Sequence, residues 1–548
     1  MIFVNTTVKR PYQRSISTSF LSAIFIFCCA AGYSKESEVV AFNKFEIVPD
    51  DSTNRPTLLS GFFTGRDNAD IALLDVTENS QFRIRIYTYN DKQVGWLKTF
   101  ETTLKSQFIF ADVMNIAGQD RLILYDQGEV SWLDLDTATQ RPLLNVLMNL
   151  NTTGIQNVLH ININRDLNCD DYQDFLIPDI DGFWVSLQSP QGSFSELSKL
   201  GPSEPFQLEA ALDKSGFNRS LTYGEEKITE FTAPIYSARV YQTDHNQDGL
   251  CDLTFWNNDH FDVYYQNEDR KFIERSTSVP ATVPIESDGL YSHILKFSGF
   301  SNLATMFGLG EKVGTTFLVS LRDMNNDSLT DLITLTLEGR SLFRQSSVYK
   351  VYYGENSAEG IAFSADNATS VEPGGKSGAA EIWGYSERTF KDLDGDDQVD
   401  LILKDIDIDP LGMLRAITSK SIGVSLEFFR MTNGNYPNKP SFVHKIRTNQ
   451  SFWGDNDPFF PAILVGDVNG DGREDLIAGG KTRDQLEIFL GIPGPNLFSG
   501  RPIEVRMAMP TDGERVWLAD LNNDGKQDIY MHDFSPSESN KLTILISR

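Results

Sequence analysis

The chain has 548 residues, of which 40% are hydrophobic and 23% are charged, so it can bury a large core. Its formal net charge of −28 argues against nucleic acid and anionic membrane surfaces as partners, because both require a basic face. Aromatic residues reach 11%, with 37 phenylalanines, and such residues favour β-strands.

The first element in chain order has the features of an export signal. Three basic residues precede an apolar run at 20–31, which small residues follow. The run is too short to span a bilayer comfortably, since a spanning helix needs about 20 residues. We therefore expect a cleaved signal peptide over 1–34 and a secreted, periplasmic or cell-surface protein without a membrane span; an uncleaved anchor is the alternative. The mature chain would keep Cys169 and Cys251, whose pairing the sequence leaves open.

Beyond the signal, the chain is organised by eight repeating units. Each unit has a short apolar run, a loop, and a second run rich in strand-forming residues, often followed by another strand after a turn. The loops begin at positions 62, 112, 166, 244, 323, 392, 467 and 520. This pattern indicates antiparallel blades.

The first two units are imperfect, and the other six share the pattern Asp-x-(Asp/Asn)-x-Asp-x-x-x-Asp. The first unit has Phe62, Thr64 and Arg66 where the other loops carry oxygen-bearing side chains. The second has Met114 and Ile116 at two of these positions. The six intact quartets are Asp166, Asn168, Asp170 and Asp174; Asp244, Asn246, Asp248 and Asp252; Asp323, Asn325, Asp327 and Asp331; Asp392, Asp394, Asp396 and Asp400; Asp467, Asn469, Asp471 and Asp475; and Asp520, Asn522, Asp524 and Asp528.

The six intact loops have the chemistry of calcium sites. Side chains at loop positions 1, 3 and 5 converge on one point, and the Asp at position 9 closes the site. Position 6 must turn sharply, which favours Gly or a residue that tolerates a positive φ. An all-oxygen donor set suits Ca²⁺ and disfavours zinc. An EF-hand is excluded because position 12 is apolar or Thr and is predicted to lie on a strand. The sequence predicts about six structural Ca²⁺ ions and none in the first two units.

Residues 465–477 and 519–529 resemble the FG-GAP/VCBS repeat, the blade unit of integrin α-subunit propellers and of many exported bacterial proteins. The resemblance covers most of 40–548. It implies an all-β propeller of four-stranded antiparallel blades, a single domain over 35–548 with six calcium loops and two degenerate repeats. Each calcium loop would join the first two strands of its blade, with the six quartets as ligands.

Eight units favour eight blades, with seven as the alternative. Only two strands are predicted after the last loop, the second of them at 541–547. The last blade therefore lacks an outer strand, which residues 39–48 could supply to close the ring.

No enzyme signature is intact in the chain, and we predict no catalytic residue and no organic cofactor. Function is expected on long connections opposite the calcium loops, where Trp383 and Trp453 are candidate ligand contacts; packing of these tryptophans between blades is the alternative. We expect a binding or adhesion scaffold for a glycan or protein. The alternatives, from fold analogy, are a lyase-like polysaccharide enzyme and a structural component of the cell envelope. The long connections are 190–234, 276–312, 355–385 and 431–458.

Overall fold

The computed structural model places most of the chain after the expected signal. The expected signal peptide (1–34), Trp383 and Trp453 lie outside the described residues. Within the described part, no helix is long and apolar enough to cross a membrane. The described residues are 40–49, 56–77, 79, 81–104, 110–126, 128–147, 159–179, 181–203, 239–287, 312–341, 344–357, 360–373, 390–406, 421–449, 461–480, 483–510, 513–533 and 541–548.

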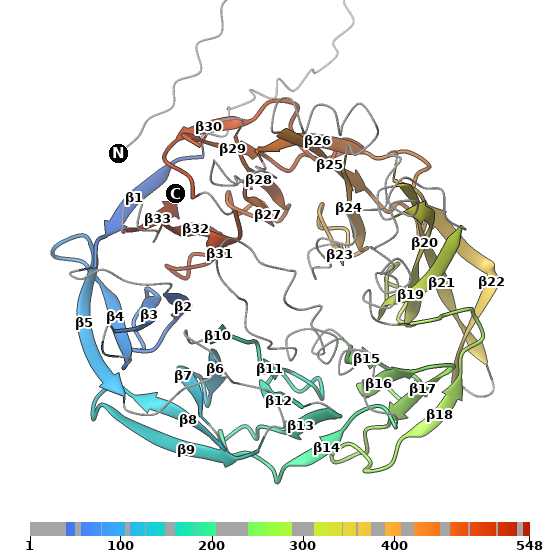
Figure 1. Ribbon diagram of the computed structural model, residues 1–548, viewed down its shortest axis with the longest axis horizontal. Coiled ribbons are helices and arrows are strands. Elements are labelled where there is room, and N and C mark those ends of the chain that lie inside the picture. Colours follow the sequence, from blue (N-terminus) through green and yellow to red (C-terminus); the bar gives the residue numbers. More distant parts are fainter. Residues whose placement is uncertain are drawn as a thin grey trace, which may run out of the picture.

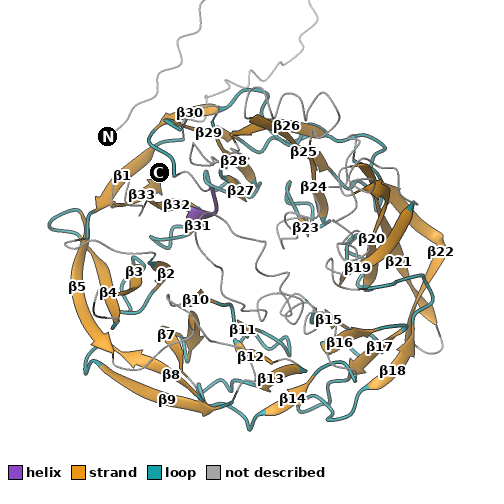
Figure 2. Cartoon of the chain, in the orientation of Figure 1, coloured by secondary structure: helices purple, strands orange, loops and turns teal. Residues whose placement is uncertain are grey.

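Eight sheets, antiparallel apart from one short parallel pair in blade 2, follow one another around a ring, so the protein is an eight-bladed β-propeller (Figure 1). Seven sheets have four strands and one has five. The described helical structure is limited to one 3-10 turn, η4 (Gly513–Arg515) (Figure 2). The all-β prediction with eight blades is confirmed, and the seven-bladed alternative is wrong.

Blades 1 to 4 are built from consecutive strands. Blade 2 has the fifth strand, β10, which pairs in parallel with β6. The strands are β2 (Thr57–Gly61), β3 (Asp70–Val76), β4 (Phe82–Asn90) and β5 (Gly95–Leu104) in blade 1; β6 (Phe110–Ile116), β7 (Gln119–Asp126), β8 (Glu129–Asp134), β9 (Thr139–Asn145) and β10 (Leu159–His160) in blade 2; β11 (Asn164–Arg165), β12 (Asp174–Asp179), β13 (Gly182–Ser186) and β14 (Ser198–Leu200) in blade 3; and β15 (Tyr241–Thr243), β16 (Asp252–Asn257), β17 (His260–Tyr264) and β18 (Thr277–Pro280) in blade 4.

Blades 5 to 8 continue the ring, and the first strand of the chain completes the last blade. The strands are β19 (Val313–Arg322), β20 (Asp331–Ser341), β21 (Arg344–Ser357) and β22 (Gly360–Val371) in blade 5; β23 (Phe390–Lys391), β24 (Asp400–Ile406), β25 (Ser421–Phe429) and β26 (Phe442–Asn449) in blade 6; β27 (Ile463–Gly466), β28 (Asp475–Gly479), β29 (Gln485–Phe489) and β30 (Ile503–Arg506) in blade 7; and β31 (Val516–Ala519), β32 (Asp528–Asp533), β33 (Lys541–Ser547) and β1 (Phe42–Ile47) in blade 8.

The N-terminal strand closes the ring as predicted. β1 pairs antiparallel with β33, from Phe42 opposite Ser547 to Ile47 opposite Leu542. Lys541 Nζ also lies 3.0 Å from Glu46 Oε1 across this pair. Blade 8 is thus assembled from strands at both ends of the chain, and β33 has no unpaired edge.

The core consists of interfaces between neighbouring blades. Alternate residues of a strand point to opposite faces of its sheet. In β33, Leu545 packs in a cluster shared with blade 7, whereas Ile544 packs in a cluster shared with blade 1. Both side chains are buried. Packing of this kind fixes each blade against its two neighbours and holds the loops at the blade ends in register.

Four segments that the sequence assigns to interblade connections contain the outer strands instead. β14, β18, β22 and β26 lie within 190–234, 276–312, 355–385 and 431–458 respectively. The outermost strand of a blade has little apolar surface to bury, and all four residues of β18 are exposed or half-buried. Outer strands of this kind lack the apolar alternation by which strands are recognised in a sequence.

Candidate metal sites in the acidic loops

The six acidic loops occupy the same place in blades 3 to 8. Each joins the first strand of a blade to the second. The residue before the loop pairs with the Asp at position 9, as Gly466 pairs with Asp475 in blade 7 and Lys391 with Asp400 in blade 6. The same register holds in the other four loops. The predicted quartets are therefore brought into six equivalent turns.

The Asp at position 1 closes each loop on itself. In blade 7, Asp467 accepts hydrogen bonds from the backbone N–H of Asp471 at 3.2 Å and of Gly472 at 2.8 Å. The equivalent pair of bonds, from positions 5 and 6, is present in the other five loops. Asp471 in turn accepts from the N–H of Arg473 at 3.0 Å, so the side chains at positions 1 and 5 are both held in place.

All six loops turn through positive φ at position 6, as the sequence predicts. Ser328 adopts this conformation without the advantage of glycine, with φ of 68°. Position 4 also has positive φ in every intact loop, a feature that the sequence pattern does not predict. The position-6 residues are Asp171, Gly249, Ser328, Asp397, Gly472 and Gly525, and the position-4 residues are Cys169, Gln247, Asn326, Gly395, Gly470 and Asn523.

The Asp at position 9 joins its loop to the third strand of the blade. Asp475 accepts from the N–H of Val468 in the loop at 3.0 Å and from the N–H of Gly491, just past β29, at 2.7 Å. The same two bonds recur in the other five blades. Each of these carboxylates is fully buried.

Burial gives these carboxylates unusual electrostatics. Desolvation, reinforced by the neighbouring loop carboxylates, raises the pKa of Asp475 to about 7, although its two backbone hydrogen bonds act in the opposite direction. A nearby cation would favour the ionised form of such a group. The same causes raise the pKa of Asp174, Asp331, Asp400 and Asp528 to about 7 and that of Asp252 to about 6.

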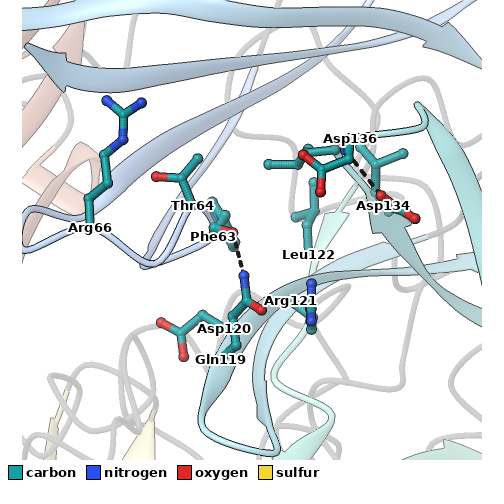
Figure 3. A pocket seen from close by; sticks show the side chains of 11 residues that line it. Phe63, Thr64, Arg66, Gln119, Asp120, Arg121, Leu122, Asp134 and Asp136 are labelled. Atoms are coloured by element: carbon teal, nitrogen blue, oxygen red, sulfur yellow. Dashed lines mark hydrogen bonds between the residues drawn. The ribbon is translucent and has the colours of Figure 1, made fainter.

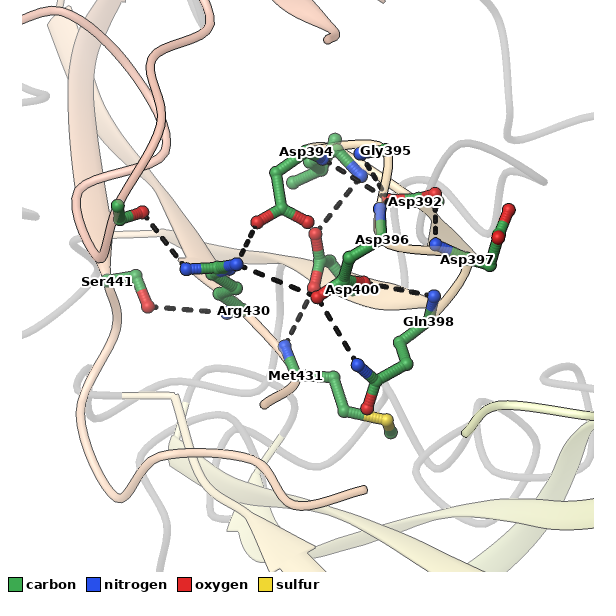
Figure 4. A network of polar contacts seen from close by, with 12 residues as sticks. Asp392, Asp394, Gly395, Asp396, Asp397, Gln398, Asp400, Arg430, Met431 and Ser441 are labelled. Atoms are coloured by element: carbon green, nitrogen blue, oxygen red, sulfur yellow. Dashed lines mark hydrogen bonds and ion pairs between the residues drawn. The ribbon is translucent and has the colours of Figure 1, made fainter. Parts of the chain in front are cut away.

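The loop of blade 6 forms the most compact acidic cluster in the described part of the chain. Asp392, Asp394 and Asp400 each place a carboxylate oxygen within 4.8 Å of the others (Figure 4). One oxygen of Asp394 is buried without a hydrogen-bond partner, and so is Oδ1 of Asn168 at the same position in blade 3. Buried oxygens without partners are costly unless a cation or donor meets them. The donor set fits a hard cation such as Ca²⁺.

The blade 6 loop also contacts an arginine from the third strand side of its blade. The Nη2 atom of Arg430, which follows β25, forms an ion pair with Asp394 and lies 3.6 Å from Asp396 Oδ2 (Figure 4). Its Nη1 donates to the carbonyl of Gly494 in blade 7 at 3.1 Å. At the equivalent position, blade 7 has Leu490. Sequence reasoning missed this residue; the one local difference of the blade 6 loop is Asp394, at position 3, where the other five loops have Asn.

Hydrogen bonds connect the loops of neighbouring blades. In blades 6 and 7, the N–H at position 8 of the loop donates to the carbonyl at position 2 of the preceding loop. Glu474 in blade 7 bonds to Leu393 in blade 6 at 3.0 Å, and Val399 in blade 6 bonds to Met324 in blade 5 at 2.8 Å. The loops therefore support one another along this part of the ring.

A disulfide connects the loops of blades 3 and 4. It joins Cys169, at position 4 of the blade 3 loop, to Cys251, at position 8 of the blade 4 loop, with the Cα atoms 5.9 Å apart. Arg270 strengthens the junction by donating to the carbonyl of Cys169 at 2.5 Å. The pairing that the sequence left open is thus a cross-link between two candidate metal loops.

The two imperfect units differ from the intact loops in different ways. Blade 1 keeps the loop length, since Gly61 pairs with Asp70, but it presents Arg66 at position 5. In blade 2 the loop is lost: β6 and β7 are joined by a tight turn of Ala117 and Gly118, both at positive φ. Asp120 of this blade instead accepts the N–H of Phe62 from blade 1 at 2.9 Å.

Comparisons with known proteins identify one of the repeats. Residues 467–531, from the blade 7 loop into β32, match a family model described as an FG-GAP-like repeat. No curated protein matches the sequence. Similar solved structures include the Tc holotoxin pore of Photorhabdus luminescens, with 13% identity and a TM-score of 0.30 over 87% of this chain and 17% of that chain. The chain thus spans less than a fifth of the toxin chain.

Two further solved structures are similar over most of their length. The V. cholerae biofilm matrix protein Bap1 shares 9% identity over 90% of this chain and 88% of that chain, with a TM-score of 0.26. A mutant NanB sialidase from Streptococcus pneumoniae shares 12% identity over 92% and 70% of the two chains, with a TM-score of 0.25. These scores support no inference about function. The repeat match and the ring of sheets together show that this chain contains an FG-GAP-like repeat within an eight-bladed β-propeller.

Proposed function

We propose that the protein is an exported, calcium-stabilised β-propeller that acts as a binding scaffold for an extracellular glycan or protein. The observation that carries the proposal is the repetition of one loop geometry in six blades, with an all-oxygen donor set around a buried carboxylate. The side chains at positions 1, 3, 5 and 9 of each loop would hold the ion. Calcium would supply positive charge among carboxylates that otherwise repel one another.

Export is supported by two features. Residues 1–34 have the composition of a signal peptide. The Cys169–Cys251 disulfide is the kind of cross-link that persists in oxidising compartments and is rare in the cytosol. A propeller fixed by metal loops and a disulfide would present its surface loops on a rigid base, which suits binding.

The calcium proposal is tested by counting ions on the mature protein. Elemental analysis and calcium titration should give about six Ca²⁺ per chain, and EDTA should lower the melting temperature, because a ligand at 100 times its Kd adds about 2.7 kcal/mol per site. Asp524→Ala, in the blade 8 loop, should lose one ion. Asp136→Ala is the matched control, since both side chains are exposed but Asp136 lies outside the acidic loops. Metal-free wild-type protein with an unchanged melting curve would contradict the proposal.

The binding proposal needs its own measurement. The mature protein, saturated with calcium, should bind a restricted set of ligands on glycan and extracellular-protein arrays, whereas heat-denatured protein should not. Failure to bind any glycan or protein on either array would argue against a binding scaffold, even if the calcium count were correct.

A further inference from the structure

The six intact loops differ in the donor that meets the carboxylate at position 5. In blades 3, 4, 5 and 8 this carboxylate accepts a hydrogen bond of 2.9 to 3.0 Å from the side-chain amide of the Asn at position 3. The amide is neutral, so a cation that enters one of these loops meets no like charge at this contact. The pairs are Asn168 and Asp170, Asn246 and Asp248, Asn325 and Asp327, and Asn522 and Asp524.

In blade 7 an arginine takes the place of this amide. Arg473, at position 7, donates from Nη2 to Asp471 Oδ2 at 2.6 Å. The amide nitrogen of Asn469, at position 3, is buried and has no hydrogen-bond partner. Blade 8 has Lys526 at position 7, but its side chain lies over Gly470 of blade 7, and the loop keeps its amide contact. A basic residue at position 7 therefore does not by itself displace the amide.

In blade 6 the arginine comes from outside the loop. Arg430 pairs with Asp394, at position 3, and lies 3.6 Å from Asp396, at position 5 (Figure 4). Its guanidinium therefore lies against two of the four expected ligands. The Nε atoms of Arg430 and Arg473 are both buried without a hydrogen-bond partner. On leaving the carboxylates, each Nε–H would recover an acceptor in water, which offsets part of the cost of displacing the arginine.

The imperfect loop of blade 1 has an arginine at a ligand position. Arg66 stands at position 5 of this loop and Thr64 at position 3 (Figure 3). Thr64 donates to Asp70, at position 9, from its N–H at 2.8 Å and from its hydroxyl at 3.2 Å. Burial raises the pKa of Asp70, and the positive charge of Arg66 acts in the opposite direction. An arginine can therefore supply positive charge to a loop of this length.

We propose that blades 6 and 7 hold a pair of lower-affinity calcium sites, at which Ca²⁺ must displace an arginine from the ligand carboxylates. A guanidinium keeps its charge at any pH a protein meets, so the arginine and the ion compete for the same oxygens. The loops of blades 3, 4, 5 and 8 would load first and hold the ring, whereas blades 6 and 7 would load only as external calcium rises. The inference rests on the proposed calcium sites and assigns an order to them.

The competition should be stronger in blade 6 than in blade 7. The side chain of Asp394 is 5% exposed, whereas that of Asp471 is 17% exposed. Water screens the more exposed pair, so its arginine is the easier one to displace. We expect the blade 6 site to bind calcium about tenfold more weakly than the four amide-paired sites, and the blade 7 site about threefold more weakly.

The test follows hydrogen exchange of each loop by mass spectrometry while free Ca²⁺ is raised over the full mature protein. The calcium concentration that gives half of a loop's protection should be highest in blade 6 and next highest in blade 7. Arg430→Gln should lower the blade 6 midpoint about tenfold, and Arg430→Lys should lower it less because the charge is kept. Arg270→Gln is the matched control: Arg270 donates to the backbone carbonyl of Cys169 rather than to a ligand carboxylate, so its loss should not tighten the blade 3 site.

Each result has a defined consequence, and the wild-type midpoints alone can overturn the inference without any variant. Six loops that gain protection at one calcium concentration would refute the ordering while leaving the calcium sites in place. A blade 6 midpoint unchanged by Arg430→Gln would refute the role of the arginine. Wild-type protein that binds no calcium by elemental analysis would instead contradict the proposed calcium sites themselves.

Discussion

Replacing Arg430 by Leu tests whether the blade 6 loop depends on an internal counter-charge. The Asp394 side chain is only 5% exposed, and that of Arg430 is 22% exposed. Breaking a fully buried pair costs about 3–5 kcal/mol, whereas a surface pair contributes about 0–1 kcal/mol. Because Arg430 retains some contact with water, we expect Arg430→Leu to destabilise the calcium-free protein by about 2–3 kcal/mol.

The structure also indicates how this loss can be relieved. The other five intact loops carry Asn at position 3, and blade 7 has Leu490 where blade 6 has Arg430. The double variant Arg430→Leu/Asp394→Asn therefore recreates the arrangement of blade 7. It should recover most of the stability, giving a coupling free energy of about 2 kcal/mol in EDTA. In saturating calcium the ion would supply the missing charge, so Arg430→Leu alone should cost less than about 1 kcal/mol.

The assay is a double-mutant cycle by urea denaturation, with and without calcium. Native-state hydrogen exchange in β24 and β25 should accompany it, because blades of a repeat protein can open locally. Arg141→Leu is the matched control: it removes an ion pair whose arginine side chain is 51% exposed and should cost less than about 1 kcal/mol. Additive single effects in EDTA, or an Arg430→Leu variant as stable as the wild type there, would refute the reasoning.

Three other predictions concern the disulfide, a buried histidine and a strained turn. Replacing Cys169 and Cys251 by Ala should lower the free energy of unfolding by up to about 4 kcal/mol, since the cross-link spans 82 residues. It should also weaken calcium binding in blades 3 and 4, and a calcium titration unchanged from the wild type would contradict this. Burial and nearby Arg515 lower the pKa of His532 from 6.5 to about 3, so the unfolded chain takes up the proton first and stability falls as pH drops below 6.5. At pH 5 the His532 contribution to this loss is about 2 kcal/mol, so the stability difference between wild type and His532→Gln should shift by about that amount between pH 7 and 5, in favour of the variant, because the loop carboxylates titrate equally in both. Ser328→Gly should raise stability by up to about 1 kcal/mol, because Ser328 has φ of 68°; a lower midpoint would show that the hydroxyl contributes more than the turn costs.

The sequence predicts those parts of the fold that depend on local chemistry. The acidic spacing fixes where the first two strands meet in blades 3 to 8, and β33 begins and ends where the apolar run at 541–547 does. In blade 2, where the spacing has degenerated, the loop expected from position 112 is instead part of β6. The N-terminal run could be assigned to ring closure because the last blade lacked a strand. The position-6 turn followed from the requirement for a positive φ, which even Ser328 satisfies.

The parts that sequence reasoning missed depend on contacts between blades. Arg430 reaches Asp394 across 36 positions of the chain, and nothing local marks it as a loop residue. Cys169 and Cys251 lie at different positions of their loops, so their proximity follows only from how two blades pack. The bond from the Gln119 side chain to the carbonyl of Phe63 likewise depends on how blade 2 packs against blade 1.

These observations indicate that the loops of blades 5 to 7 act as linked sites along the ring. Each Asp at position 9 bonds to the third strand of its own blade, and in blades 6 and 7 the position-8 amide also reaches the preceding loop, as Glu474 reaches Leu393. A calcium ion that orders one loop would therefore also order the acceptor used by its neighbour. The disulfide provides a permanent link between blades 3 and 4, whereas blades 1 and 2 lack the acidic quartets. Linkage of this kind predicts that calcium binds with positive cooperativity between neighbouring blades such as 6 and 7.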